Sequence, residues 1–178
     1  MNIGIDIDGV VYPWHDSIYR YFKEEKRFTG TAREFWKYFM SLPVDVQMYY
    51  VSIPIHYLDA SPTDDVLTYL PLIAELGTVY YVTNRTPDLM PVTRKFFNNF
   101  SLPFKENVIF TDTKANYIRL LNIEMYLDDR GKNVDEVVGL TDAYLFKAVH
   151  NWEYRDKYKL INSMKEFYEK IKGERKSG

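Results

Sequence analysis

The sequence predicts an α/β fold built around a doubly wound, Rossmann-like parallel sheet. Short β-branched or aromatic runs end in polar residues or Gly, and stretches of helical periodicity separate them. A chain that alternates in this way forms parallel strands joined by right-handed crossovers. The strands are expected at residues 2–7, 79–82, 107–110, 124–127 and 143–149.

Helices are expected between these strands from the spacing of apolar residues. Between residues 64 and 76 the apolar side chains recur at helical intervals, and Gly77 follows as a stop signal. The last helix has an apolar face formed by Leu160, Met164, Phe167, Tyr168 and Ile171. The other helices are expected at 87–100, 114–121 and 134–138, the last with Asn133 as its N-cap.

The stretch between the first strand and Asp64 has no strand-like run. It contains three helical patterns rich in aromatic residues, at 17–27, 32–40 and 44–51. These patterns indicate a small helical cap inserted after the first strand. We expect an α/β core of residues 1–13 and 60–172, a cap of residues 14–59, and a frayed polar tail at 173–178.

Composition and charge exclude several classes of function. The 178 residues fit one domain with a small insertion, and the lack of Cys excludes disulfides, thiolate metal sites and cysteine nucleophiles. A formal net charge of −2 argues against a polynucleotide partner. No apolar run reaches the length of a transmembrane helix, and Met1 leads into the first strand without a signal sequence, so a cytoplasmic location is expected.

Polar side chains follow four of the predicted strands. Because the carboxyl ends of parallel strands meet at one edge of a sheet, these side chains are expected to lie together. Singly, each is more often a turn acid, an ordinary strand residue or a solvated charge. Together, four carboxylates repel one another and raise one another's pKa, which favours a divalent cation, and oxygen ligands without Cys indicate Mg²⁺. The residues are Asp6, Asp8, Thr83, Asn84, Lys114, Asp128 and Asp129.

Four motifs, in this order, resemble those of the haloacid dehalogenase (HAD) superfamily of phosphotransferases over nearly the whole chain. They are Asp-x-Asp-Gly-Val after apolar residues at 5–10, Thr after apolar residues at 81–83, Lys at 114, and Asp-Asp after apolar residues at 126–129. The resemblance implies a HAD-like fold with a cap. It also implies that Asp6 is a nucleophile that forms an aspartyl-phosphate, and that Asp8 acts first as general acid and then as general base. Thr83 would hydrogen-bond a phosphoryl oxygen, and Lys114 would balance the negative charge.

The same resemblance implies a Mg²⁺ site. Its expected protein ligands are Asp6, the backbone carbonyl of Asp8, and Asp129, while Asp128 either ligates the ion or orients its neighbours. The crowded anionic site is expected to keep Asp8 partly protonated when substrate binds. Mg²⁺ would screen the repulsion between an anionic nucleophile and an anionic phosphate.

Within the superfamily, the chain resembles the 5′(3′)-deoxyribonucleotidases, in which aromatic residues of the cap and first loop sandwich the base. The shared features are an aromatic residue five positions after Gly9, the segment Tyr57-Leu58-Asp59, the segment Leu127-Asp128-Asp129-Arg130, and His150-Asn151 after a strand. Trp14 and Tyr57 match the base-stacking positions best. Looser candidates are Trp36, Phe39 and Tyr49, and packing in the cap core is favoured for Trp36 and Phe39.

The chain departs from the eukaryotic members of that family at two places. After the second strand it has Asn84-Arg85 where those members have Ser-Pro. Before the third motif it has Asp112-Thr113 where they have an Arg that helps to hold phosphate. Arg85 or Arg130 is expected to substitute for that Arg, and Asn84 is expected beside the substrate.

The expected function is Mg²⁺-dependent hydrolysis of (deoxy)ribonucleoside monophosphates, of the 5′-nucleotidase type, in nucleotide metabolism. The alternatives are hydrolysis of another small phosphomonoester such as a sugar phosphate, removal of phosphate from polynucleotide ends, and a non-catalytic binding role. Low net charge disfavours the polynucleotide, and the presence of both Asp6 and Asp8 disfavours the binding role. No membrane partner is expected, and a homodimer is left open. The three histidines, His15, His56 and His150, are too scattered in sequence to predict a metal site.

Overall fold

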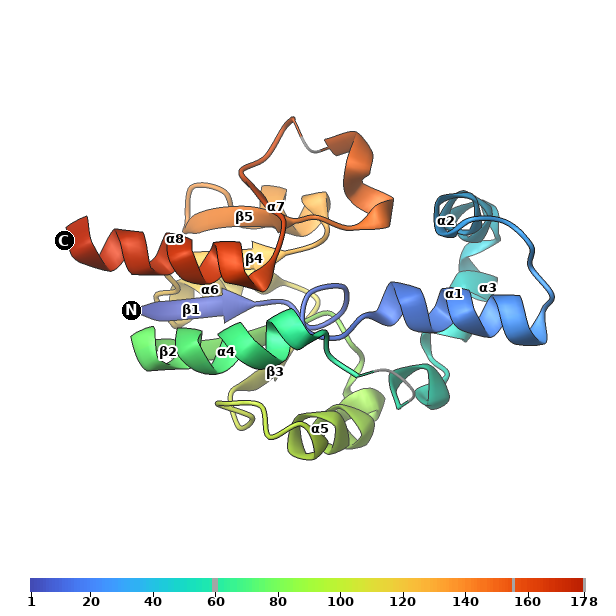
Figure 1. Ribbon diagram of the computed structural model, residues 1–178, viewed down its shortest axis with the longest axis horizontal. Helices are drawn as coiled ribbons and strands as arrows, with labels where there is room; N and C mark the ends of the chain where they lie inside the picture. Colours follow the sequence, from blue (N-terminus) through green and yellow to red (C-terminus); the bar gives the residue numbers. More distant parts are fainter. Residues whose placement is uncertain (59–60, 155, 178) are drawn as a thin grey trace.

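The computed structural model describes residues 1–58, 61–154 and 156–177, so Asp59 of the predicted nucleotidase segment lies outside the described residues. A six-stranded, all-parallel sheet with the order β3-β2-β1-β4-β5-β6 forms its centre (Figure 1). This confirms the predicted α/β fold, and the strand order reverses between β1 and β4, where ligands bind in such sheets. The strands are β1 Asn2–Ile5, β2 Thr78–Thr83, β3 Val108–Phe110, β4 Met125–Asp128, β5 Asp142–Phe146 and β6 Leu160–Ile161.

Strand β6 differs from the sequence prediction, which placed Leu160 in the last helix. Leu160 and Ile161 pair with Leu145 and Phe146 of β5, and the helix begins only at Met164. A two-residue strand has too few residues to show an alternating pattern, so the sequence does not distinguish it from the start of the helix.

The two faces of the sheet bury separate hydrophobic clusters because side chains alternate along each strand. Ile5 and Leu127 belong to the larger cluster, whereas Tyr126 and Leu145 belong to the cluster on the opposite face. Burial on both faces is typical of a parallel sheet.

Helices cover both faces. Figure 1 shows α4 and α8 in front of the sheet, and these two helices contact each other and, with α5, supply side chains to the larger cluster. Helices α6 and α7 contact each other and supply the opposite cluster. The bounds are α4 Asp64–Leu76, α5 Met90–Asn99, α6 Lys114–Leu120, α7 Gly131–Val137 and α8 Met164–Ser177, with short 3₁₀ turns η2 Pro87–Leu89 and η3 Val149–Tyr154.

Two helix ends differ from the predictions. Helix α7 starts at Gly131 with Arg130 as N-cap, because the Asn133 side chain, expected to cap it, donates instead to the carboxylate of Asp128. Helix α8 continues to Ser177, beyond the expected start of a frayed tail at residue 173.

A helical cap follows β1 and projects beyond the carboxyl ends of the strands (Figure 1). Thr31 and Glu34 form a capping box at the start of α2, which satisfies two backbone N–H groups. Phe22, Phe35 and Phe39 are buried between the helices and pack ring to ring. The cap elements are α1 Trp14–Glu25, α2 Ala32–Ser41, α3 Val44–Val51 and the 3₁₀ turn η1 Pro54–Tyr57.

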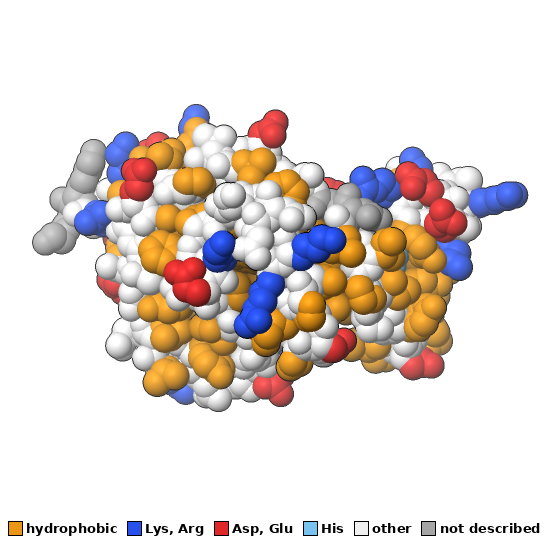
Figure 2. Space-filling model, turned by 90° about the horizontal axis from the view of Figure 1, so that it is seen from below, with side chains coloured by type: hydrophobic (Ala, Val, Ile, Leu, Met, Phe, Trp, Pro, Cys, Tyr) orange, Lys and Arg blue, Asp and Glu red, His pale blue; other side chains and the backbone are white. Residues whose placement is uncertain are grey.

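The cap also exposes apolar side chains. Figure 2 shows hydrophobic side chains gathered over the right-hand lobe of the molecule. Val44, Met48 and Tyr49 of α3 are exposed apolar residues of the cap. Among the described helices, none is both long and apolar enough to cross a bilayer.

Candidate active site

The edge formed by the carboxyl ends of the strands brings the predicted polar residues together. Asp6 and Asp8 follow β1, Thr83 ends β2, and Asp128 ends β4. Lys114 is the first residue of α6 and is fully buried. The sheet topology therefore gathers chemistry-bearing groups from β1, β2, β4 and the start of α6.

Lys114 links two of the carboxylates. Its Nζ lies 2.7 Å from Oδ1 of Asp6 and 2.6 Å from Oδ2 of Asp128. Burial lowers the pKa of Lys114, but the two carboxylates outweigh burial and the net shift is upward, so the side chain is an ammonium ion. Lys114 therefore positions Asp6 and offsets one unit of negative charge.

Asp128 is held by hydrogen bonds at both carboxylate oxygens. Oδ2 accepts from Lys114 and from the hydroxyl of Tyr126 at 2.6 Å, and Oδ1 accepts from the backbone N–H of Arg130 at 2.8 Å. The side chain of Asn133 donates to both oxygens at 3.1 Å. With so many donors, Asp128 is suited to orienting Lys114.

Asp129 has the opposite environment. Its side chain is 1% exposed, yet neither carboxylate oxygen has a hydrogen-bond partner within the described chain. Burial and the charges of Asp6 and Asp128 raise its pKa well above the usual range. Burial and the charge of Asp128 also raise the pKa of Asp6, to about 7. One ligand atom from each of these three residues lies within 4.8 Å of the others, which is close enough to share a cation.

Asp8 is bound by Arg85. Nε of Arg85 donates to Oδ2 of Asp8 at 2.9 Å and Nη2 donates to Oδ1 at 2.5 Å, a two-point ion pair. Burial tends to lower the pKa of Arg85, but Asp8 more than compensates and the pKa is raised. The guanidinium also lies over the ring of Tyr57, 4.5 Å from its centroid. The expectation that Asp8 is crowded by anions is therefore wrong, because its nearest charge is a cation.

The remaining polar candidates lie around this centre. The hydroxyl of Thr83 accepts the backbone N–H of Arg85 at 3.1 Å, and Thr83 is almost fully buried. Asn84 is exposed, and its side chain donates to the carbonyl of Thr111 and accepts from Asn133. Arg130 is also exposed.

The aromatic candidates differ in accessibility. Trp14 is 6% exposed and Tyr57 is 2% exposed, so neither ring offers an open stacking face in this conformation. Tyr57 donates its hydroxyl to the carbonyl of Val51 and stacks over Arg85 instead. Phe39 is buried in the cap core, and the exposed Tyr49 lies on the outer surface of the cap.

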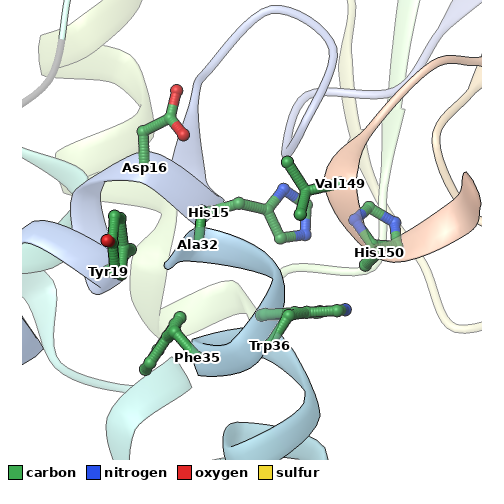
Figure 3. Close-up of a pocket in the computed structure, with 8 residues that line it drawn as sticks. All are labelled: His15, Asp16, Tyr19, Ala32, Phe35, Trp36, Val149 and His150. Atoms are coloured by element: carbon green, nitrogen blue, oxygen red, sulfur yellow. The ribbon is translucent and has the colours of Figure 1, made fainter. Parts of the chain in front are cut away.

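Trp36 is half-buried and lines a small pocket between cap and core (Figure 3). His15 of α1 and His150 of η3 stack at 4.2 Å between ring centroids, and the Trp36 ring lies 4.7 Å and 5.3 Å from them. Sequence reasoning missed this group, since His15 and His150 are far apart along the chain. Both lie beside Asp129, so these two histidines, although scattered in sequence, lie close enough to share an ion with it.

The two imidazoles do not neutralise Asp129. Burial lowers the pKa of His15 well below its usual range and lowers that of His150 to about 4. Both rings are therefore neutral at pH 7 and add no positive charge to the site.

Comparisons with known proteins identify the fold. No family model and no curated protein sequence matches the chain. A solved L-2-haloacid dehalogenase aligns over 97% of this chain and 98% of its own, with 10% identity and a TM-score of 0.58. A HAD-superfamily hydrolase of subfamily IA from Geobacter sulfurreducens aligns over 96% of this chain and 95% of its own, with 15% identity and a TM-score of 0.54. The chain therefore has the fold of the HAD-superfamily hydrolases.

Proposed function

We propose that this protein is a Mg²⁺-dependent hydrolase of small phosphomonoesters that acts through an aspartyl-phosphate on Asp6. The observation that carries the proposal is a charge imbalance at the sheet edge. Three buried carboxylates, Asp6, Asp128 and Asp129, face one ammonium ion, Lys114, and the Asp8–Arg85 pair adds no net charge. A divalent cation offsets the excess negative charge, so that an anionic substrate can bind at this edge.

The donor set fits Mg²⁺. Asp129 offers two buried carboxylate oxygens that lack hydrogen-bond donors, and Asp6 lies within reach of the same ion. The backbone carbonyl of Asp8 is the third proposed ligand, and Asp128 orients Lys114. When bound, Mg²⁺ supplies charge stabilisation to the transferring phosphoryl group.

In the proposed reaction, a carboxylate oxygen of Asp6 attacks phosphorus, the ester P–O bond breaks, and the leaving oxygen takes a proton from Asp8, which acquires that proton from solvent once Arg85 has released it. Asp8 then removes a proton from a water molecule, which hydrolyses the aspartyl-phosphate to release phosphate and regenerate Asp6. Lys114 holds Asp6 in place, and the hydroxyl of Thr83, which accepts from the Arg85 N–H, is free to direct its own proton toward a phosphoryl oxygen.

Arg85 must release Asp8 during this cycle. Both oxygens of Asp8 accept from the guanidinium, so proton transfer to a leaving group requires at least one of these hydrogen bonds to break. A substrate phosphate competes for the same guanidinium because Arg binds phosphate in the same two-point manner. Arg85 would thereby bind phosphate in place of the Arg that precedes the third motif in the eukaryotic deoxyribonucleotidases.

The proposed substrates are (deoxy)ribonucleoside monophosphates, with sugar phosphates as the alternative. Trp36 and the two stacked imidazoles form an aromatic wall beside Asp129, and stacking on a base contributes about 1–3 kcal/mol. The pocket has a volume of about 10 Å³, room for about one water molecule, so the cap must move away from η3 to admit a substrate. A cytoplasmic location remains a prediction, and a homodimer is left open.

Phosphate release tests the proposal. The panel contains deoxyribonucleoside and ribonucleoside monophosphates, sugar phosphates, a 5′-phosphorylated oligonucleotide and an aryl phosphate, each with Mg²⁺ and with EDTA. A 2-haloacid is included because one similar structure is a haloacid dehalogenase. We expect Mg²⁺-dependent release that is strongest with nucleotides and abolished in Asp6→Asn. The matched control is Asp112→Asn, an exposed carboxylate near the same edge.

Each outcome has one meaning. Phosphate release that is strongest with sugar phosphates would support the proposed phosphatase reaction and contradict nucleotides as the substrates. Halide release without phosphate release, or full phosphatase activity in Asp6→Asn, contradicts the proposed function.

A further inference from the structure

A second cluster of metal-ligating atoms lies on the side of Asp129 that faces the cap. Oδ2 of Asp129 is 3.7 Å from Nδ1 of His15 and 3.4 Å from Nε2 of His150. One ligand atom from each of the three residues lies within 4.8 Å of the other two. Ligands bound tetrahedrally to Zn²⁺ at its usual N and O distances are about 3.4 Å apart, so the observed spacings suit one shared ion.

The surroundings of Asp129 leave its carboxylate able to bind more than one cation. The carboxylate is buried, and both of its oxygens lack hydrogen-bond partners within the described chain. Gly9 makes the close approach feasible: it has a φ of +83°, and a Cβ atom there would lie 1.8 Å from Oδ2 of Asp129 and 2.9 Å from Cε1 of His15. The backbone thus leaves space for these two side chains to meet.

We propose that His15, Asp129 and His150 bind a second divalent cation, in addition to Mg²⁺ at Asp6, with Asp129 as the shared ligand. Two imidazole nitrogens and one carboxylate oxygen favour a borderline metal such as Zn²⁺ or Co²⁺ over Mg²⁺, which prefers oxygen. A bridging carboxylate can contact two cations, one through each oxygen, and this is the arrangement in many two-metal sites.

The hydrogen bond that His150 makes in this structure does not prevent ligation. Nε2 of His150 also lies 3.0 Å from the backbone carbonyl of Asp129. The side chain of Asn151 donates to that same carbonyl at 2.7 Å. The carbonyl therefore keeps a donor when the ring proton of His150 moves to Nδ1 and the Nε2 lone pair binds an ion.

The proposed ion would connect the cap to the core. His15 lies near the start of α1, the first cap helix, whereas His150 lies in η3, which follows the core strand β5 (Figure 3). Trp36 of α2 packs against both imidazoles from the cap side. A bound ion would hold the cap in the closed position seen here, and its release would allow the cap to open.

Calorimetric titration with Zn²⁺ in saturating Mg²⁺ tests the site, and the visible absorption of bound Co²⁺ reports its coordination. The variants are His15→Gln and His150→Gln. The matched control is Asp16→Asn, because the exposed Asp16 lines the same pocket but is directed away from the two imidazoles in Figure 3. Thermal melting without metal and titration with Mg²⁺ verify that each variant is folded.

We expect one Zn²⁺ per chain in the wild type and in Asp16→Asn, and an affinity at least about 100-fold lower in each His variant. The proposal is overturned if folded His variants bind Zn²⁺ as tightly as the wild type, if Mg²⁺ displaces the Zn²⁺, or if the wild type binds none. These readouts measure binding alone, so they remain informative even when the phosphatase assay fails.

Discussion

The raised pKa of Asp6 makes Mg²⁺ binding depend on pH in a predictable direction. Without a cation, burial and the charge of Asp128 raise this pKa to about 7. The protonated carboxyl is a poor ligand, so Mg²⁺ binding must displace its proton. About one tenth of Asp6 is ionised at pH 6 and about nine tenths at pH 8, which predicts an apparent Mg²⁺ affinity about tenfold weaker at pH 6. The raised pKa of Asp129 acts in the same direction.

Calorimetric titration at pH 6, 7 and 8 measures this effect. Repeating each titration in buffers of different ionisation enthalpy gives the number of protons released on binding, which we expect to approach one or more at pH 6. Asp112→Asn serves as a control, since this exposed carboxylate is not one of the three that lie close enough to share the cation and should leave the pH dependence unchanged. An affinity that is equal at pH 6 and pH 8 in the wild type would refute the reasoning.

The same linkage predicts the stability of the metal-free protein. The folded state holds the Asp6 proton more tightly than the unfolded state does, because the pKa of a solvated Asp carboxyl is near 3.8. Between pH 4 and pH 7 the unfolded chain has released this proton while the folded protein retains it. The free energy of unfolding therefore falls as pH rises, by about 1.4 kcal/mol per pH unit at most for one group. Added Mg²⁺ should offset the fall, as urea denaturation would show.

Three substitutions test the charge of the site and the packing of the site and the cap by urea denaturation. Lys114→Met leaves two buried carboxylates without their cation and should lower the free energy of unfolding by about 3–5 kcal/mol at pH 7. The loss should be smaller at pH 5, because protonation of the carboxylates relieves their repulsion. An equal loss at both pH values would contradict the charge argument. Gly9→Ala places a Cβ against Asp129 at positive φ and should cost about 1–3 kcal/mol of stability and weaken Mg²⁺ binding. Unchanged Mg²⁺ affinity would show that the close packing of Asp129 against Gly9 is not required for Mg²⁺ binding. Phe39→Ala opens a cavity in the cap and should cost about 3–5 kcal/mol, and a loss below 1 kcal/mol would mean that the cap core is not tightly packed.

The architecture and the gathering of polar residues at the sheet edge could be predicted because their determinants are local. Each strand is a short apolar run, and the residues that follow it lie at the same edge whatever the details of packing. Asp6, Asp8, Thr83 and Asp128 are placed by this rule alone, and Lys114 is brought to them at the start of α6. The two-residue strand β6 escaped prediction because it is too short to have a period.

Other features of the site depend on contacts between distant parts of the chain, and only the tertiary structure decided them. Arg85 binds Asp8 across 77 residues of sequence, which replaces an expected anionic environment with an ion pair. His15 and His150 meet at Asp129 only because the first cap helix lies against η3. The sequence by itself determined the sheet and the charged groups at its edge, since periodicity and strand ends specify them. How the cap lies on that edge depends on side-chain packing across the whole fold, and a one-dimensional pattern does not contain that information.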